Sequence, residues 1–394
     1  MQKVSMAQIF SLGLAIFSML FGAGNLMYPL LVGMTAGKYT LFGMLGFLLS
    51  AVCLPLLGLI TMIFFDGDYK AFFRRLGTTT GNILIGICML IIGPGIAIPR
   101  ITTLSHTMIA PFIPVPLLQQ ENVISSLIFA LIFLGVTFLA TFRESKIIDV
   151  LGKIISPLLV LSLIIIIFKG IFMAETMVPT DNTALTAFTS NFIRGYETLD
   201  LLGGIFFASI VITLLKVMYG SYYDQKTSAK VGLQAGFIGT GVLALIYIGM
   251  SLLGMYHGHN LQQLHAGELF RVISFHVLGF QGSLIIGTAV LMACLSTAIA
   301  LGATVADYFQ KTICRHTISF VTALALTLLA CVPLSIFGLA KVLALTGGPL
   351  VYIGTPVIIA LTVCNLAYKL CEFQPVKIPV FVTFICAIIS YYAM

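Results

Sequence analysis

The sequence predicts an all-α membrane protein that crosses the bilayer eleven times and is built from two inverted five-helix repeats. Hydrophobic residues make up 59% of its 394 positions and only 8% are charged, whereas about a quarter of the residues in a soluble domain are charged. Uncharged stretches such as 39–65 and 231–256 exceed the roughly 20 apolar residues that a helix needs to cross a bilayer. The alternating pattern of β-barrel strands is missing, so the expected spans are helical.

The apolar runs give eleven expected spans, and the loops between them give an orientation. The spans cover residues 8–34, 40–64, 80–108, 122–142, 150–168, 197–215, 231–256, 280–305, 317–338, 342–367 and 377–394. Lys and Arg gather in cytoplasmic loops of membrane proteins. Of the twenty Lys and Arg residues, fourteen lie on one side of the expected spans. Arg100 lies within the third span, and the opposite side holds the other five, Lys38, Lys169, Arg194, Arg271 and Lys341. The N-terminus is therefore expected in the cytoplasm and the C-terminus in the periplasm.

A long outer loop divides the spans into two sets. Residues 1–169 form a first five-helix repeat, 170–196 the extracellular loop, 197–367 the second repeat and 368–394 one additional C-terminal span. Because five is an odd number, the second copy inserts in the opposite direction. Inverted repeats place their sites near the bilayer midplane, where helices are interrupted. The division therefore predicts a break in the first helix of each repeat.

Both of these helices contain sequence that is poor material for a continuous helix. Residues Gly22–Pro29, GAGNLMYP, hold two glycines, an amide and a proline. Residues Tyr196–Gly204, YETLDLLGG, place Asp200 near a glycine pair. Unwound carbonyls can coordinate a cation, and helix N-termini can receive a carboxylate. The alternative is structural: glycines for close helix packing and a simple kink at Pro29.

Two further spans carry polar groups in an apolar setting. Ser296 and Thr297 offer adjacent hydroxyls as hard oxygen ligands for sodium, unless each bonds back to a carbonyl of the preceding turn. Arg100 ends the segment GPGIAIPR in the third span, where a guanidinium is costly unless it is paired or hydrated. It is expected to act as an outer gate or as a partner of Asp200; the alternative is an anchor that snorkels to the outer interface.

Four motifs together resemble the bacterial branched-chain amino acid:cation symporters (LIVCS family, BrnQ type). They are GAGNLMYP at Gly22–Pro29, GPGIAIPR at Gly93–Arg100, GYETLDLLGG at Gly195–Gly204 and ACLSTAIALG at Ala293–Gly302. The resemblance implies the leucine-transporter-like fold of the APC superfamily. It also implies import of leucine, isoleucine and valine with Na+ or H+ by alternating access across the bacterial cytoplasmic (inner) membrane. The family usually has twelve spans, and the expected eleven leave the five-plus-five core intact.

The resemblance also implies where substrate and ion bind. The implied sodium ligands are the carbonyls of Ser18, Phe21 and Ala293 and the hydroxyls of Ser296 and Thr297. A second sodium site would use Asn25 together with Thr198. The substrate would contact residues at both breaks, namely Gly22, Ala23, Gly24, Thr198, Asp200 and Gly203. Its carboxylate would face the amides of 22–24, and Asp200 would receive its ammonium or a coupling proton.

Other classes of protein are less compatible with the sequence. A different hydrophobic amino acid such as methionine stays open as the substrate, and a channel is a weaker alternative. An enzyme would need clustered catalytic groups, and the nearest approach, His257, His259 and His265, falls in an outer loop. No cofactor and no nucleic-acid partner are expected, because the cysteines form no CxxC pair and the net charge of +7 is scattered over loops. The expected partners are a small hydrophobic amino acid, the coupling cation and the lipid bilayer.

Overall fold

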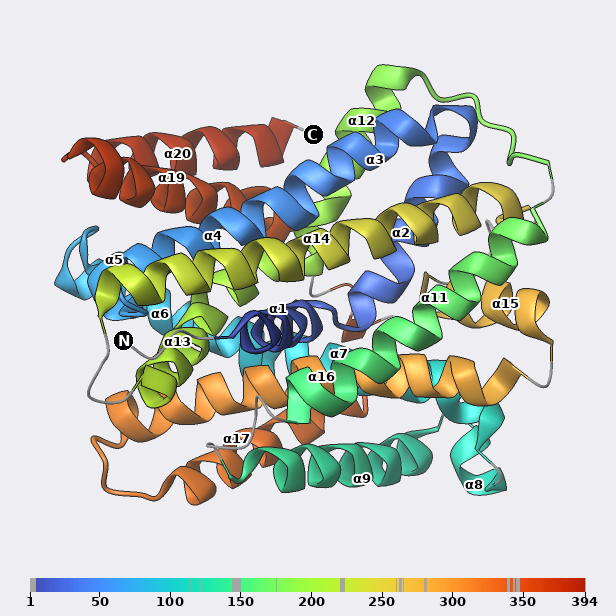
Figure 1. Ribbon diagram of the computed structural model, residues 1–394, viewed down its shortest axis with the longest axis horizontal. Coiled ribbons are helices and arrows are strands. Elements are labelled where there is room, and N and C mark those ends of the chain that lie inside the picture. The colour runs from blue at the N-terminus through green and yellow to red at the C-terminus, as the bar shows by residue number, and fades with distance from the viewer. Residues whose placement is uncertain are drawn as a thin grey trace.

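The computed structural model of the chain describes residues 5–113, 115–120, 122–143, 150–174, 176–219, 224–259, 261, 264, 266–279, 282–338, 341–342, 344 and 348–393. Lys3 and Lys146, two of the fourteen inner-side cations, lie outside these ranges, as does His265. All regular secondary structure in the described residues is helical (Figure 1).

The helices of the first half, in chain order, are α1 (Met6–Leu20), α2 (Ala23–Ala36), η1 (Gly37–Tyr39), α3 (Thr40–Leu48), η2 (Leu49–Cys53), α4 (Leu54–Phe64), α5 (Tyr69–Arg74), α6 (Thr78–Leu90), η3 (Ile91–Gly95), α7 (Ala97–Ile109), η4 (Ala110–Phe112), α8 (Pro116–Gln119), α9 (Val123–Thr141), η6 (Leu151–Ile155) and α11 (Ser156–Phe172). Those of the second half are α12 (Ala184–Arg194), η7 (Gly195–Thr198), α13 (Asp200–Tyr219), α14 (Gln225–His257), α15 (Ala266–Leu278), α16 (Ser283–Tyr308), η10 (Phe309–Ile313), α17 (Phe320–Ser335), η11 (Leu350–Gly354), α19 (Thr355–Cys371) and α20 (Lys377–Ala393).

The first span is interrupted where its sequence predicts. Helix α1 ends at Leu20, and α2 begins at Ala23. Between them Phe21 (φ −80°, ψ 85°) and Gly22 (φ −96°, ψ −170°) leave the helical region. Pro29, by contrast, lies inside α2 without ending it. The glycines and Asn25 therefore mark the interruption, and the proline does not.

The expected sixth span is also interrupted, and a helix precedes its expected start. The sequence predicts a loop over 170–196 and a span from 197; the structure instead has helix α12 within 170–196, followed by η7 and, after Leu199, by α13. The two halves bend by 40° at this point. Leu199 adopts the left-handed conformation (φ 63°, ψ 13°), which is unfavourable for a residue with a Cβ. The sequence missed α12 because this helix is amphipathic and carries polar residues such as Asn191 and Arg194.

The third span changes direction just before Arg100. Helix α6 passes into the π-helical segment η3, where Gly93 leaves the helical region (φ −96°, ψ −122°) and Pro94 lacks a backbone donor. Helix α7 then begins at Ala97, so that Arg100 lies in its first turn. The GPG segment therefore sets the direction of α7 and, with it, the position of the Arg100 side chain.

The count of spans follows from helix length and composition. Seven helical segments of the described part are long and apolar enough to cross a membrane, and the bent pair of α12 with α13 makes eight. Three apolar helices, α1, α17 and α20, have only 15, 16 and 17 residues. The chain is thus an all-helical, multi-span membrane protein with seven or eight candidate spans, while eleven stays a prediction. Helix α15 forms in the segment between expected spans seven and eight.

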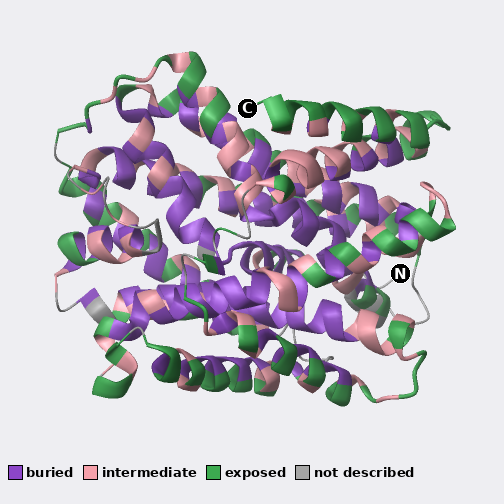
Figure 2. Ribbon diagram, turned by 180° about the vertical axis from the view of Figure 1, so that it is seen from behind, coloured by how far each residue is buried: buried purple, intermediate pink, exposed green. Residues whose placement is uncertain are grey.

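The broken helices lie at the centre of the bundle. Both α1 and α2 pack against the long helix α14, α13 packs against α4, and α16 packs against α7 and α11. In Figure 1, α1 is seen nearly end-on in the middle of the molecule. Figure 2 shows buried residues concentrated on the central helices, whereas the last helix, beside the C-terminus, is mostly exposed. The site described below is therefore surrounded by protein.

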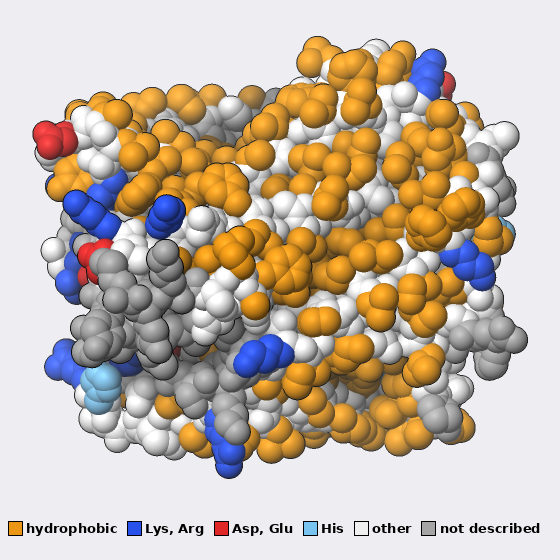
Figure 3. Space-filling view, viewed as in Figure 1, with side chains coloured by type: hydrophobic (Ala, Val, Ile, Leu, Met, Phe, Trp, Pro, Cys, Tyr) orange, Lys and Arg blue, Asp and Glu red, His pale blue; other side chains and the backbone are white. Residues whose placement is uncertain are grey.

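The outer surface is apolar, as a lipid-facing surface requires. Large exposed hydrophobic side chains occur along α3, α9, α11 and α20, including Leu45, Leu139, Phe168 and Phe381. Figure 3 shows apolar side chains over most of one face, with Lys and Arg mainly toward its edges. A soluble protein rarely exposes so large a continuous apolar area.

Helix α14 approaches α2 so closely that only glycine fits at the contact. A Cβ atom added to Gly254 would lie 2.0 Å from the carbonyl oxygen of Leu30. Gly254→Ala is therefore expected to separate the helices at a cost of about 1–3 kcal/mol and to lower the temperature at which detergent-solubilised protein loses its monodisperse elution peak. Gly241→Ala on the same helix is the control, because nothing lies within 4 Å of its added Cβ. Equal stability of the two variants would contradict this packing.

Candidate substrate and cation site

A buried carboxylate joins three helices at the two breaks. Asp200, the first residue of α13, accepts hydrogen bonds through Oδ2 from Asn25 Nδ2 (2.7 Å) and from the Tyr247 hydroxyl (3.2 Å). The Asn25 amide also contacts the Tyr247 hydroxyl. These residues come from α13, α2 and α14 and are only 6%, 2% and 1% exposed. The negative charge of Asp200 is thus met by neutral donors rather than by a cationic side chain.

Two of these residues also shape the breaks themselves. The Asn25 side-chain oxygen accepts a hydrogen bond from the Gly22 N–H (3.3 Å), which folds the amide back over the start of α2. The Thr198 hydroxyl accepts one from the Asp200 N–H (3.3 Å) and donates to the Gly195 carbonyl (2.9 Å). Side-chain hydrogen bonds thus hold part of the backbone at each break.

Arg100 lies at the sixth-span break and not at the outer surface. Its guanidinium donates from Nη1 to the Glu197 carbonyl (2.7 Å) and from Nη2 to the Thr198 carbonyl (3.2 Å). These carbonyls end the helical turn η7, where the backbone offers unpaired acceptors. Arg100 is 4% exposed, so it is not an interfacial anchor, and its bonds go to backbone oxygens rather than to Asp200. Its role as a gate stays a prediction.

One nitrogen of this guanidinium, Nε, lacks a hydrogen-bond partner within the described ranges. The Nε atom of Arg100 is buried and makes no hydrogen bond to any described residue. A buried donor left in this state costs about 1–3 kcal/mol. The structural contacts of Arg100 within the described residues therefore leave one buried donor unsatisfied.

The predicted residues surround a small cavity between the breaks. Its volume is about 30 Å³, compared with about 300–1,000 Å³ for ordinary ligand pockets. It is lined by Met19, Leu20, Gly22, Asn25, Ile92, Ala97, Arg100, Ile101, Thr198, Leu199, Asp200, Gly203, Phe207, Thr297 and Leu301. The site is thus narrow in this structure, and its wall combines the charged side chains of Arg100 and Asp200 with mainly apolar ones.

Most of the predicted substrate residues meet at this cavity. Gly22, Thr198, Asp200 and Gly203 line it directly. Gly24 lies beside it, since a Cβ built there would be 3.4 Å from Nη2 of Arg100. The position 23 backbone belongs to the first turn of α2, and its side chain is outside the described part. Sequence reasoning missed Tyr247, although a tyrosine hydroxyl inside an apolar span has to find a partner.

The predicted cation ligands lie where α16 passes α1. The Thr297 hydroxyl reaches across to the Ser18 carbonyl (3.5 Å), whereas the Ser296 hydroxyl bonds within its own helix to the Ala293 carbonyl (3.1 Å). Ser18, Ser296 and Ala293 are fully buried. Phe21, at the end of α1, packs its ring against Phe17 (5.2 Å between centroids) and Tyr247 (6.2 Å). The four oxygens thus form two pairs, one between α1 and α16 and one within α16; a cation site that joins them with the Phe21 carbonyl stays a prediction.

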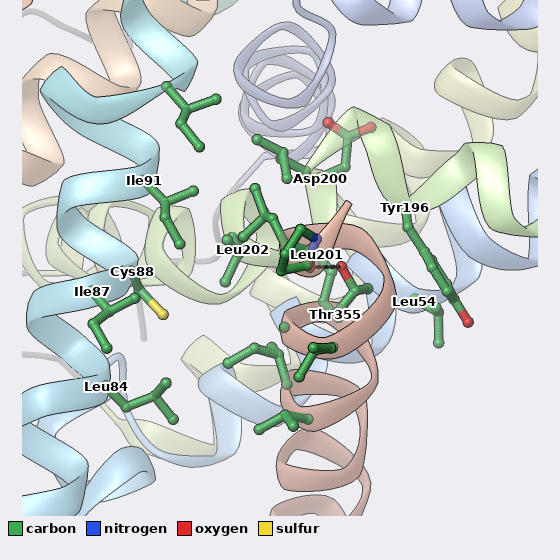
Figure 4. Close-up of a pocket in the computed structure, with 18 of the residues that line it drawn as sticks. Leu54, Leu84, Ile87, Cys88, Ile91, Tyr196, Asp200, Leu201, Leu202 and Thr355 are labelled. Atoms are coloured by element: carbon green, nitrogen blue, oxygen red, sulfur yellow. Dashed lines mark hydrogen bonds between the residues drawn. The ribbon is translucent and has the colours of Figure 1, made fainter. Parts of the chain in front are cut away.

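A larger apolar cavity adjoins the small one. It has a volume of about 540 Å³ and lies among α4, α6, α13, η11 and α19 (Figure 4). Leu199 and Asp200 line both cavities. The residue in the left-handed conformation thus forms part of the wall between a narrow polar site and an apolar space large enough for a ligand.

The histidines that the sequence analysis assigned to an outer loop do not form a metal centre among the described residues, and His257 is the last residue of α14. His257 Nε2 contacts the Gly170 carbonyl (2.8 Å), and His259 Nε2 contacts the Thr176 carbonyl (2.6 Å). No group of three or more His, Cys, Asp or Glu suited to a metal occurs in the part of the chain that the structure covers.

Known proteins resemble this chain in both sequence and structure. The chain is 32% identical over 337 residues to the branched-chain amino acid permease BraB of Bacillus subtilis (strain 168), covering 84% of this chain and 74% of the permease. Its structure is similar to that of MhsT in complex with L-phenylalanine, with a TM-score of 0.61, 15% identity and 98% of each chain covered. It is also similar to a substrate-bound, outward-open Na+-coupled sialic acid symporter, with a TM-score of 0.57, 12% identity, and 97% of this chain and 88% of that one covered. These structures show the fold.

A family model described as "Branched-chain amino acid transport protein" matches residues 5–394, which confirms the resemblance carried by the four motifs. The chain belongs to the branched-chain amino acid transport protein family, a family of transporters and not of enzymes.

Proposed function

We propose that this chain imports leucine, isoleucine and valine across the bacterial cytoplasmic membrane by symport with a cation. The observation that carries the proposal is the meeting of two helix breaks at one narrow cavity, with Asp200 and Arg100 in the same wall. An amino acid carries both charges, and each needs local compensation away from water. Membership of the family, and the permease named BraB, support branched-chain substrates.

The architecture that we propose is a leucine-transporter-like fold with eleven spans. Residues 1–169 and 197–367 form the two inverted repeats, and 368–394 add one helix. The breaks before α2 and α13 support this division, since each lies in the first span of a half. One repeat moving against the other would expose the site to each side of the membrane in turn. The uneven distribution of Lys and Arg supports an N-terminus in the cytoplasm and a C-terminus in the periplasm.

The substrate is proposed to lie between the breaks. Its carboxylate faces the backbone amides of Gly22, Ala23 and Gly24, which start α2, and its ammonium faces Asp200. Its aliphatic side chain occupies the apolar side, and displacement of Leu199 would join the two adjoining cavities to give it room. An apolar pocket separates ligands that differ by one methylene by only about 1–3 kcal/mol. Leucine, isoleucine and valine would share the site, and methionine is the second candidate.

The coupling ion is proposed to be Na+, bound by the carbonyls of Ser18, Phe21 and Ala293 and the hydroxyls of Ser296 and Thr297. The contact between Thr297 and the Ser18 carbonyl supports a site between α1 and α16. H+ is the alternative, and Asp200 is then the residue that would carry it. A second Na+ at Asn25 has less support, because its side-chain oxygen already accepts a bond from Gly22.

Uptake of labelled leucine into proteoliposomes tests the function and the ion together. With an inward Na+ gradient and no pH gradient, we expect saturable accumulation above the equilibrium level. The reason is that Na+ releases free energy as it moves down its concentration gradient, to which an inside-negative membrane potential adds about 2.3 kcal/mol per cation for each 100 mV. An imposed H+ gradient alone is expected to give no accumulation. Accumulation under an H+ gradient alone would identify H+, and not Na+, as the coupling ion. Non-saturable equilibration without accumulation would indicate a channel.

A further inference from the structure

We propose that Arg100 binds the carboxylate of the transported amino acid and so restricts transport to substrates with a free carboxylate. This inference rests on the proposed function, because it specifies how the same site holds its substrate. It gives Arg100 a role inside the site, where sequence analysis expected a gate or a partner for Asp200.

The hydrogen bonding of Arg100 leaves it able to accept a ligand. A guanidinium has five N–H donors in a fixed plane, and two of them hold the Glu197 and Thr198 carbonyls. These bonds fix the position of the group. The buried Nε–H has no partner among the described residues, and the side chain lines the small cavity. An oriented guanidinium with a free edge is suited to bidentate binding of a carboxylate.

A second source of positive potential lies next to this edge. The N-terminus of α2, a helix of 14 residues, begins at the same cavity, and the first amides of a helix have no partner within it. Gly24 keeps this corner open, since a Cβ there would lie 3.4 Å from Nη2 of Arg100 and 3.1 Å from the Tyr28 ring. The arginine and the first-turn amides of α2 therefore converge on one position.

The acidic side chains near Arg100 do not hydrogen-bond to the free edge of its guanidinium. Glu197 interacts with it electrostatically, as it does with Arg194, but no hydrogen bond joins the Glu197 carboxylate to Arg100 in the described part. Asp200 also lies near, but it accepts bonds from Asn25 and Tyr247. Asp200 and Arg100 thus form opposite charges on the wall of one cavity without a hydrogen bond between them. A zwitterion between them would satisfy both.

The test compares leucine with leucinamide, which has the same side chain and ammonium but no carboxylate. Displacement of labelled leucine from detergent-purified protein gives both affinities. In Arg100→Gln we expect leucine affinity to fall roughly 100-fold, the upper range for a charged hydrogen bond, while leucinamide affinity is unchanged. In Arg100→Lys we expect a fall of about tenfold for leucine alone, because lysine keeps the charge but loses the planar donor pair.

Arg194 offers the matched control. It is a second, partly buried arginine that donates to the Thr35 hydroxyl and the Asn191 side chain. Arg194→Lys is expected to keep the leucine-to-leucinamide ratio of the unaltered protein.

The proposal is overturned if either Arg100 variant retains the leucine-to-leucinamide affinity ratio of the unaltered protein. This includes the case in which both ligands weaken equally, as loss of a structural contact to η7 would cause. Should Arg100→Gln fail to fold, Arg100→Lys decides. If the unaltered protein binds no leucine, the proposed function fails instead.

Discussion

Asp200→Asn is expected to lower leucine uptake about 100-fold while leaving the protein folded, an effect equal to the roughly 3 kcal/mol of a strong charged hydrogen bond. The amide has nearly the shape of the carboxylate and can still accept one bond from Asn25 or Tyr247. It removes the negative charge from the wall of the cavity, and with it the partner for an ammonium or a coupling proton. The expected loss is therefore functional. Initial uptake rates in proteoliposomes and the elution profile of the purified variant measure the two effects.

Asp307→Asn is the control for this experiment. Asp307 pairs with Lys311 across one turn (2.5 Å), and both side chains are partly exposed. Surface pairs of this kind contribute about 0–1 kcal/mol, so uptake is expected to stay close to that of the unaltered protein. Uptake by the Asp200 variant at the level of this control would remove Asp200 from the site.

The double change Ser296→Ala/Thr297→Ala is expected to abolish Na+-stimulated uptake and to leave the slow Na+-independent rate as it is. It removes both side-chain oxygens of the proposed cation site, including the one that reaches the Ser18 carbonyl. Carbonyls alone would leave the ion under-coordinated. The measurement is leucine uptake over a series of Na+ concentrations at constant ionic strength.

Thr304→Ala gives the comparison on the same helix. The Thr304 hydroxyl is buried and bonds only back to the Ala300 carbonyl (2.8 Å), so its loss is expected to leave the Na+ dependence intact. A double variant with the Na+ dependence of the unaltered protein would show that the cation binds elsewhere.

How far sequence leads to this site depends on whether a signal is local. The interruption near Gly22 follows from local composition, because glycine and asparagine favour non-helical backbone wherever they occur. Helix α12 escaped prediction because its apolar residues cover only one side, and a hydropathy average cannot separate such a helix from a loop. The sequence identified Arg100 as a candidate site residue, but its position beside η7 depends on how α6 and α7 are joined at Gly93.

Partners across the fold are beyond the reach of local patterns. Tyr247 meets Asp200 and Asn25 only because α14 packs against both parts of the first span. The residues next to Tyr247 in the sequence do not indicate these partners. The family motifs supplied positions, whereas the contacts that give Asp200 its surroundings needed the three-dimensional arrangement.

The smallness of the cavity between the breaks bears on how tightly this protein holds its cargo. A volume of about 30 Å³ is far below that of ordinary ligand pockets, so we expect this cavity to expand before an amino acid binds. When only a fraction of a population is competent, the apparent dissociation constant exceeds the intrinsic one by the inverse of that fraction. A substitution far from the cavity that favours the expanded form would therefore tighten apparent affinity without touching the ligand. Affinity in this carrier is set jointly by its contacts and by how often it opens.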